Sequence, residues 1–238
     1  MKPVLVLQHL SGDGPAYLGQ WLAGCGVPMD VRNTQAGDAY PETLAEHRAL
    51  AILGGEMSAN DPLPSLRQAE ALVLEAVRDG IPTLGHCLGG QLMARALGAR
   101  IGTAPAPEVG FQEVSLVPGP ASVAWFGSAG SVRVFEWHYE AFELPAGATL
   151  LAGNEACPHQ AFAVGPHLAM QFHIELDGEK LQRWSLDDGP KYRQARERHP
   201  GSVHSGERMR ADARLCLAAH EALADRIYAR WLGGALTN

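Results

Sequence analysis

Short apolar runs alternate with stretches of helical spacing along the first hundred residues of the chain. Runs of strand length lie at 3–8, 29–33, 50–53 and 81–84. The spacing of apolar positions predicts helices over 16–23, from residue 65 to Gly80, and over 88–97. Ser65 and Gln68 match a capping box at the start of the second of these helices. Apolar strands that alternate with helices are typical of a parallel sheet covered by helices on both faces.

The pattern changes after Gly110. Short alternating runs, separated by Pro and Gly, predict antiparallel strands at 111–117, 131–137, 149–152, 160–164 and 169–174. Residues 177–205 are polar and predict irregular structure with short helices. Residues 207–232 predict a long helix with one apolar face, formed by Met209, Leu215, Leu223, Ile227 and Trp231. With no repeat and no linker, the chain is expected to be one α/β domain over 1–238: a mostly parallel central sheet flanked by helices, an antiparallel extension and a C-terminal helix.

Composition and charge limit the classes of partner that are expected to bind this chain. The 238 residues carry a formal charge of −7, and no run of Lys and Arg is interleaved with aromatic residues, so nucleic acid is not expected as a ligand. The apolar run at the N-terminus is too short for a signal peptide or a membrane span, which favours a cytoplasmic location and no membrane contact. No phosphate-binding glycine loop is present, and no cofactor is expected.

The four cysteines are widely spaced, so they are expected to be free thiols and not a disulfide framework. Cys157-Pro-His159 resembles half of a metal site, but no second cluster completes four ligands. No metal is therefore expected.

Cys87 is placed where chemistry can use it. The segment Gly85-His-Cys87-Leu-Gly89 joins the end of an apolar strand to the start of a helix. A sharp strand-to-helix turn exposes its central side chain and needs small neighbours. The helix N-terminus stabilises a thiolate, and the N–H of Leu88 can stabilise a developing oxyanion. A buried cysteine in a tight structural turn is the alternative.

A nucleophilic cysteine needs a base that a third group orients. His173 and Glu175 lie two residues apart on a predicted strand, where side chains at i and i+2 share a face. His86 adjoins Cys87, but its side chain is expected to point the other way.

Together these segments resemble the class I glutamine amidotransferase family, in particular its GMP synthase-like stand-alone members. The resemblance covers residues 3–176 and implies the flavodoxin-like fold of that family. The matching segments are Gly85-His-Cys87-Leu-Gly89-Gly-Gln91, Gln171-Phe-His173-Ile-Glu175, Gly54-Gly55-Glu-Met-Ser, Leu92-Met-Ala-x-Ala-Leu-Gly98, Glu108-Val-Gly110, Trp137-His138-x-x-x-Phe142-x-Leu-Pro145 and Gln160-Ala-Phe162.

The resemblance implies a role for each matching residue. Cys87 would attack the side-chain amide carbon of glutamine, His173 would carry the proton, and Glu175 would orient His173. The N–H of Gly55 would be the second oxyanion donor, beside that of Leu88. The remaining implied residues bind substrate: Gln91 in the glutamine pocket, and the backbone of His138, Tyr139 and Glu140 at the amino-acid head.

Two positions depart from the family pattern. Ile174 stands where the family usually has Pro, with the spacing kept, and Glu56 stands where Pro often follows the double glycine. Glu56 leaves open whether the oxyanion loop is preformed.

Three functions stay open at this point. The chain could release ammonia from glutamine for a separate synthase subunit, hydrolyse γ-glutamyl amides or peptides by itself, or be a silent binding protein of the same fold. A cysteine hydrolase that uses the adjacent His86 as its base is a weaker alternative.

Overall fold

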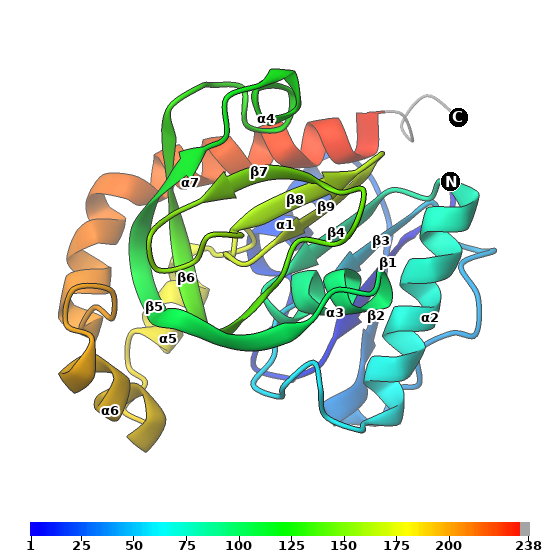
Figure 1. Ribbon diagram of the computed structural model, residues 1–238. Coiled ribbons are helices and arrows are strands. Elements are labelled where there is room, and N and C mark those ends of the chain that lie inside the picture. The colour runs from blue at the N-terminus through cyan, green and yellow to red at the C-terminus, as the bar shows by residue number, and fades with distance from the viewer. Residues whose placement is uncertain (234–238) are drawn as a thin grey trace.

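Five parallel strands form one half of the sheet. The computed structural model describes residues 1–233, and its strands form a single nine-stranded sheet in the order β2-β1-β3-β4-β9-β8-β7-β5-β6 (Figure 1). The parallel strands are β2 (Met29–Asn33), β1 (Val4–Gln8), β3 (Ala49–Ile52), β4 (Thr83–His86) and β9 (His167–Met170). In β1, β3, β4 and β9 every residue is buried, as expected for strands covered on both faces.

The other half of the sheet is antiparallel. Beyond β9 lie β8 (Ala161–Val164), β7 (Thr149–Gly153), β5 (Ile101–Leu116) and β6 (Ser131–Phe142). β5 and β6 form a long curved ribbon with an irregularity between Thr103 and Glu108. Strand β9 joins the two halves, because it pairs parallel to β4 and antiparallel to β8. The predicted architecture, a mostly parallel central sheet with an antiparallel extension, is confirmed.

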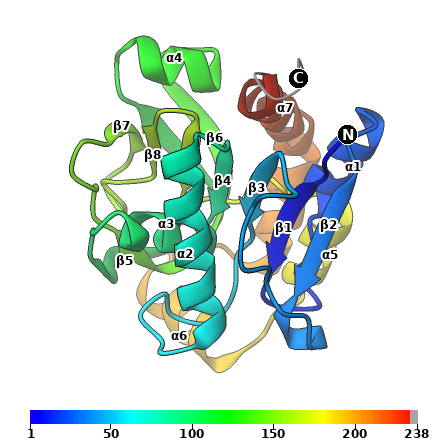
Figure 2. The same ribbon diagram turned by 90° about the vertical axis from the view of Figure 1, so that its right-hand side faces the viewer.

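Helices cover both faces of the sheet (Figure 2). On one face, α1 (Ala16–Gly24), α4 (Pro120–Phe126) and the long α7 (Gly206–Gly233) contribute to one apolar cluster. On the other face, α2 (Pro64–Asp79) and α3 (Leu88–Ala96) form a second. None of the helices within residues 1–233 has the length and apolar character needed to cross a membrane.

A third apolar cluster lies where the chain returns past the β5–β6 ribbon. Helices α5 (Gly178–Trp184) and α6 (Pro190–Arg198) pack there with the start of α7. The prediction of short helices in the polar segment 177–205 is confirmed. These helices lie beside the carboxyl end of the parallel strands, where the candidate site is found (Figure 1).

Several local predictions were wrong. Ser65 does not cap α2, because Pro64 takes the first helical position and Leu63 precedes it without a side-chain cap. Helix α4 was missed inside the segment assigned to strands. Leu215 is 82% exposed and does not lie on the buried face of α7.

Candidate active site

Cys87 occupies a strained turn between β4 and α3. Its backbone has φ 49° and ψ −108°, a conformation that residues other than glycine seldom adopt. The flanking glycines make this turn sterically feasible: a Cβ on Gly85 would lie 2.6 Å from the carbonyl carbon of Gly89, and one on Gly89 would collide with the carbonyl oxygen of Ile52. The structure therefore bears out the expectation that the cysteine turn needs small residues on both sides.

The Cys87 thiol is buried except for a small opening, with 6% of the residue exposed. Its sulfur lies 3.6 Å from the carbonyl oxygen of Trp137 and 3.7 Å from Nε2 of Gln171. The backbone N–H of Cys87 donates to the carbonyl of Met170 at 2.9 Å, which fixes the turn against the end of β9. Leu88 begins α3, so the positive end of that helix lies beside the sulfur.

His173 and Glu175 lie in the segment that follows β9. Nδ1 of His173 lies 2.7 Å from Oε1 of Glu175, and the backbone N–H of His173 donates to the backbone carbonyl of Phe135 at 2.9 Å. Nε2 of His173 has no hydrogen-bond partner among residues 1–233. The expected side-by-side placement occurs, but not because both lie on a strand: β9 ends at Met170, and Glu175 lies in a turn.

The charges of the site favour a protonated imidazole. Burial alone would lower the pKa of His173, but the carboxylate of Glu175 and the thiol of Cys87 outweigh burial and raise that pKa to about 10. Burial alone would also raise the pKa of Glu175. The ammonium of Lys180 and then the charge on His173 outweigh it and hold this pKa well below its usual range. At neutral pH, His173 therefore has a proton to give, and Glu175 is ionised.

Lys180 is the charged residue that the sequence argument missed. Its Nζ is fully buried and lies 3.0 Å from Oε1 of Glu175, in contact also with Oδ1 of Asp13 and the carbonyl of Gly14. The side chain of Asp177 caps α5, because its carboxylate accepts a hydrogen bond from the backbone N–H of Lys180 at 2.7 Å. A lysine in a polar segment is normally exposed, so the local pattern gave no signal for this buried position.

His86 does not take the place of His173. Its ring is buried, with Nδ1 3.3 Å from the carbonyl oxygen of Ile52 and Nε2 3.9 Å from Oε2 of Glu175. Burial lowers its pKa, so the ring is neutral at pH 7. The ring also lies near the second oxygen of the same carboxylate that holds His173, a contact that the sequence did not predict.

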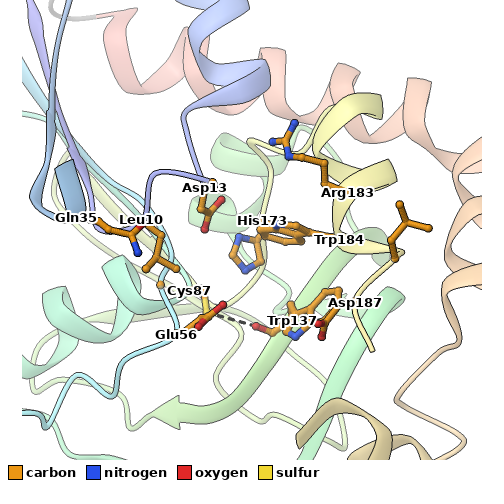
Figure 3. Close-up of a pocket in the computed structure, with 13 residues that line it drawn as sticks. Leu10, Asp13, Gln35, Glu56, Cys87, Trp137, His173, Arg183, Trp184 and Asp187 are labelled. Atoms are coloured by element: carbon orange, nitrogen blue, oxygen red, sulfur yellow. Dashed lines mark hydrogen bonds between the residues drawn. The ribbon is translucent and has the colours of Figure 1, made fainter. Parts of the chain in front are cut away.

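A cavity of about 540 Å³ opens in front of Cys87 and His173 (Figure 3). Gly55, which follows β3, lies on its wall beside Glu56. The cavity thus brings together the two residues expected to react and the one that the family resemblance implies as an oxyanion donor. Its other lining residues are Leu10, Gly12, Asp13, Gln35, Trp137, Arg183, Trp184, Leu186 and Asp187.

Gln91, expected in the glutamine pocket, and His138, Tyr139 and Glu140, expected at the amino-acid head, are not on the lining of this cavity. Nε2 of Gln91 donates to the carbonyl of Glu140 at 3.0 Å and lies 3.4 Å from Oε1 of Gln171. Nδ1 of His138 lies 3.2 Å from the same Glu140 carbonyl. Tyr139 is partly exposed, with Nζ of Lys191 over its ring. Their role in substrate binding stays a prediction.

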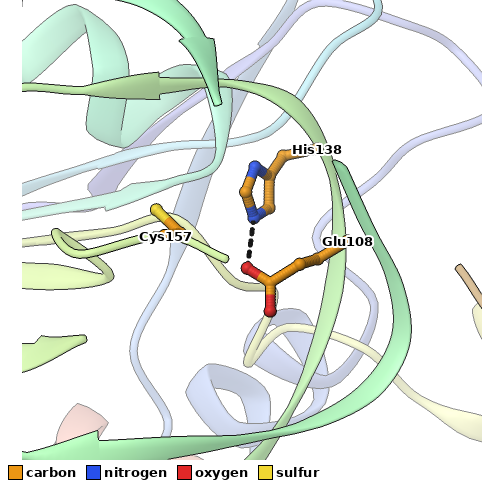
Figure 4. A group of neighbouring side chains, drawn as sticks. All are labelled: Glu108, His138 and Cys157. Atoms are coloured by element: carbon orange, nitrogen blue, oxygen red, sulfur yellow. Dashed lines mark hydrogen bonds and ion pairs between the residues drawn. The ribbon is translucent and has the colours of Figure 1, made fainter. Parts of the chain in front are cut away.

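A buried polar cluster that includes the side chain of His138 lies beside the backbone of residues 138–140 (Figure 4). One possible ligand atom from each of Glu108, His138 and Cys157 lies within 4.8 Å of the other two, the only such group of three or more found among residues 1–233. The Glu108 carboxylate already accepts from Asn154 at 2.6 Å and from Gln160 at 2.7 Å, and lies 3.1 Å from Nε2 of His138. These hydrogen bonds account for the cluster without an ion, and the expectation of no metal stays a prediction.

The fold and the site define an α/β protein with a cysteine at a strand-to-helix elbow, beside a histidine held by a glutamate. The model of the family "Glutamine amidotransferase class-I" matches residues 18–187. The chain belongs to this family, and the resemblance drawn from its motifs is confirmed.

Two proteins of high similarity cover most of the chain. The glutamine amidotransferase-like protein YfeJ of Salmonella typhimurium is 31% identical over 191 residues, which are 76% of this chain and 79% of that protein. The crystal structure of a glutamine amidotransferase from Methylobacillus flagellatus matches with a TM-score of 0.91 and 33% identity, covering 98% of this chain and 95% of that one. The predicted fold class is confirmed by this likeness.

Other relatives differ in what their names say they do. One subunit of the glutamine-hydrolyzing GMP synthase of Thermococcus kodakarensis is 30% identical over 56% of this chain and 71% of that protein. The match to the GMP synthase of Aeropyrum pernix spans 36% of that longer protein. γ-Glutamyl peptidase 3 of Arabidopsis thaliana is 32% identical over 41% of this chain and 42% of its own length.

Proposed function

We propose that this protein is a cysteine-dependent amide hydrolase that cleaves the γ-amide of glutamine or of another γ-glutamyl compound. One observation carries the proposal. Nδ1 of His173 lies 2.7 Å from Oε1 of Glu175, Nε2 of His173 has no hydrogen-bond partner among residues 1–233, and His173 lines the same cavity as Cys87. This arrangement has the nucleophile, the proton carrier and the orienting group that amide cleavage through a thioester requires.

In the first half of the reaction, the proton of the Cys87 thiol passes to Nε2 of His173, the sulfur attacks the γ-carbonyl carbon, and the carbonyl electrons move onto the oxygen. The N–H groups of Leu88 and Gly55 would stabilise that oxyanion. When the carbonyl re-forms, the C–N bond breaks and the nitrogen takes the proton from Nε2 of His173. The pKa of about 10 supports this role, because the imidazole holds its proton at neutral pH.

In the second half, water attacks the γ-glutamyl thioester, and His173, now neutral, accepts a proton from it. Collapse of this intermediate expels the Cys87 sulfur and releases glutamate. Glu175 keeps the imidazole oriented through both halves and stabilises its charged form, while Lys180 keeps Glu175 ionised. No metal or cofactor takes part in any step of this scheme.

Two relatives support different uses of the same reaction. The likeness to the GMP synthase of Thermococcus kodakarensis supports glutamine as the substrate, with ammonia passing to a separate synthase subunit. The likeness to a γ-glutamyl peptidase supports hydrolysis of γ-glutamyl compounds by the chain alone. In both cases the expected location remains the cytoplasm.

Glutamate release from glutamine and from a panel of γ-glutamyl amides tests the proposal. Wild type should release glutamate from at least one donor, and Cys87→Ser should lower that rate by at least about a thousandfold. Cys25→Ser, at an exposed position, serves as the matched control and should behave as wild type. Glutamate release from Cys87→Ser at the wild-type rate would refute the nucleophile assignment.

A further inference from the structure

The leaving group of the proposed reaction must lie beside His173. Nε2 of His173 is the nitrogen that delivers the proton to the departing amine, and it has no hydrogen-bond partner among residues 1–233. The side chain that packs against this imidazole from the cavity wall is Trp184, with ring centroids 4.8 Å apart and planes nearly perpendicular at 87°. A group carried by the leaving nitrogen would therefore lie close to Trp184.

The wall continues as an aromatic and apolar surface. Trp137 lies 5.6 Å from Trp184, ring centroid to ring centroid, and both line the cavity. Leu186 lines the same cavity with 66% of its surface exposed, which makes it one of the most exposed large apolar residues in the described chain. Arg183 and Asp187 complete this side of the cavity and give it one charge of each sign.

The space is larger than ammonia needs. Ammonia is close in size to water, whose share of liquid volume is about 30 Å³. The cavity measures about 540 Å³. This lies within the range of roughly 300–1,000 Å³ typical of pockets that enclose drug-sized ligands, which are larger than glutamine. The cavity therefore has room for a group on the leaving nitrogen in addition to the glutamyl part.

One short helix, α5, carries both Trp184 of the cavity wall and Lys180, which holds the carboxylate behind His173. Lys180 and Trp184 are four residues apart on α5 and so lie on the same face. Lys180 holds the Glu175 carboxylate at 3.0 Å and also contacts Asp13. The ion pair that orients the carboxylate behind His173 therefore also sets the distance between His173 and Trp184, so the wall is preorganised.

We propose that Trp137, Trp184 and Leu186 form a leaving-group subsite, and that the preferred substrate is the γ-glutamyl amide of an amine with an aromatic or bulky apolar group. This inference rests on the proposed function and names the substrate class of the same site. Hydrolysis of such a substrate releases glutamate and the free amine by the two half-reactions above, with the proton on the departing nitrogen coming from His173.

Three donors with the same glutamyl part test the subsite: glutamine, γ-glutamylmethylamide and γ-glutamylbenzylamide. Wild type should hydrolyse the benzylamide with a kcat/KM about tenfold or more above that of the methylamide. Trp184→Ala should abolish most of this preference. Leu186→Ala should reduce it by a smaller factor without risk to the core, because the side chain is mostly exposed. Leu74→Ala, at a half-exposed leucine of α2 outside the cavity lining, is the matched control and should keep the full preference.

The outcomes separate the two proposals. Hydrolysis of glutamine and of the methylamide, with the benzylamide cleaved no better, would overturn the subsite and leave the proposed function standing. The same holds if Trp184→Ala lowers kcat/KM for all three donors by one common factor. No glutamate from any of the three donors would contradict the proposed function itself, and the subsite with it.

Discussion

At the scale of single residues, the imidazole of His173 is held at one nitrogen and free at the other. Glu175 fixes Nδ1, and the carboxylate is in turn fixed by Lys180 from one side, with His86 beside its second oxygen. Glu175 and Lys180, five residues apart in the chain, thus hold one catalytic candidate. Removing either of them leaves a buried charge without its partner, which makes the group sensitive to single substitutions.

The first prediction concerns the pH dependence of stability. The folded state raises the pKa of His173 from the ordinary value of 6.5 to about 10, so it binds a proton more tightly than the unfolded state does. The stability that this group contributes is complete below pH 6.5 and is lost as pH rises towards 10. Five buried histidines (His9, His86, His167, His204 and His220) have a lowered pKa in the folded state and act in the opposite sense near neutral pH, so the effect of His173 is measured as the difference between wild type and a variant that lacks only this imidazole. Denaturant unfolding between about pH 6.5 and 8, below the range where unfolded thiols titrate, should show wild-type stability falling with pH relative to that variant.

The variant His173→Gln is the control for this slope, since it removes the titrating group. The free energy of unfolding of wild type minus that of the variant should decrease as pH rises over the same range. Equal slopes in the two proteins would show that the imidazole carries no excess proton in the folded state.

At the scale of elements, the turn between β4 and α3 depends on glycine, because a side chain at either flank would collide with backbone atoms. Gly89→Ala should destabilise the fold by about 1–3 kcal/mol or more, since its Cβ would meet the carbonyl oxygen of Ile52. Gly24→Ala is the matched control at the end of α1, where a Cβ meets nothing within 4 Å. That change should stay within about 0.5 kcal/mol of wild type by denaturant unfolding.

The same pair also reports on function. Gly89→Ala should reduce glutamate release more than its loss of stability explains, because the turn that exposes Cys87 must shift. A Gly89→Ala protein as stable and as active as Gly24→Ala would contradict this account of the elbow.

The local pattern of hydrophobic and polar residues predicted those helices and strands whose own burial determines that pattern. Four of the five parallel strands (β1 to β4) and the elbow followed from continuous apolar runs and from Gly85-x-Cys87-x-Gly89, whereas β9 was expected only among the antiparallel strands and also pairs parallel with β4. Helix α4 was missed although Pro120 at its first position and Gly127 after its end are ordinary helix signals. The run at 169–174 was too long as a strand, because β9 ends at Met170 and the chain turns there to place His173. Long-range burial, as at Lys180, leaves no trace in local spacing.

At the scale of the whole molecule, helices α5 and α6 pack against the β5–β6 ribbon, and α5 contributes part of the cavity wall. If this wall serves a leaving amine, the chain has the groups that its reaction needs. We therefore predict that the purified protein turns over its best γ-glutamyl amide unaided, at an ordinary rate of about 1–10³ per second. Turnover that stays far below this range on every donor would favour a site that waits for a synthase partner.

The central claim, that Cys87 is the nucleophile of a glutamyl-binding site, is tested most directly by covalent labelling. A chloroketone analogue of glutamine loses chloride to an attacking thiolate and marks the sulfur permanently. At low dose and near-neutral pH, peptide mass mapping should find the label on Cys87 first, and excess glutamine should slow the labelling. Cys25 is exposed and Cys216 partly so, but neither lines the cavity, and burial raises the pKa of Cys157. Label on any of these three as fast as on Cys87, or no protection by glutamine, would contradict the account.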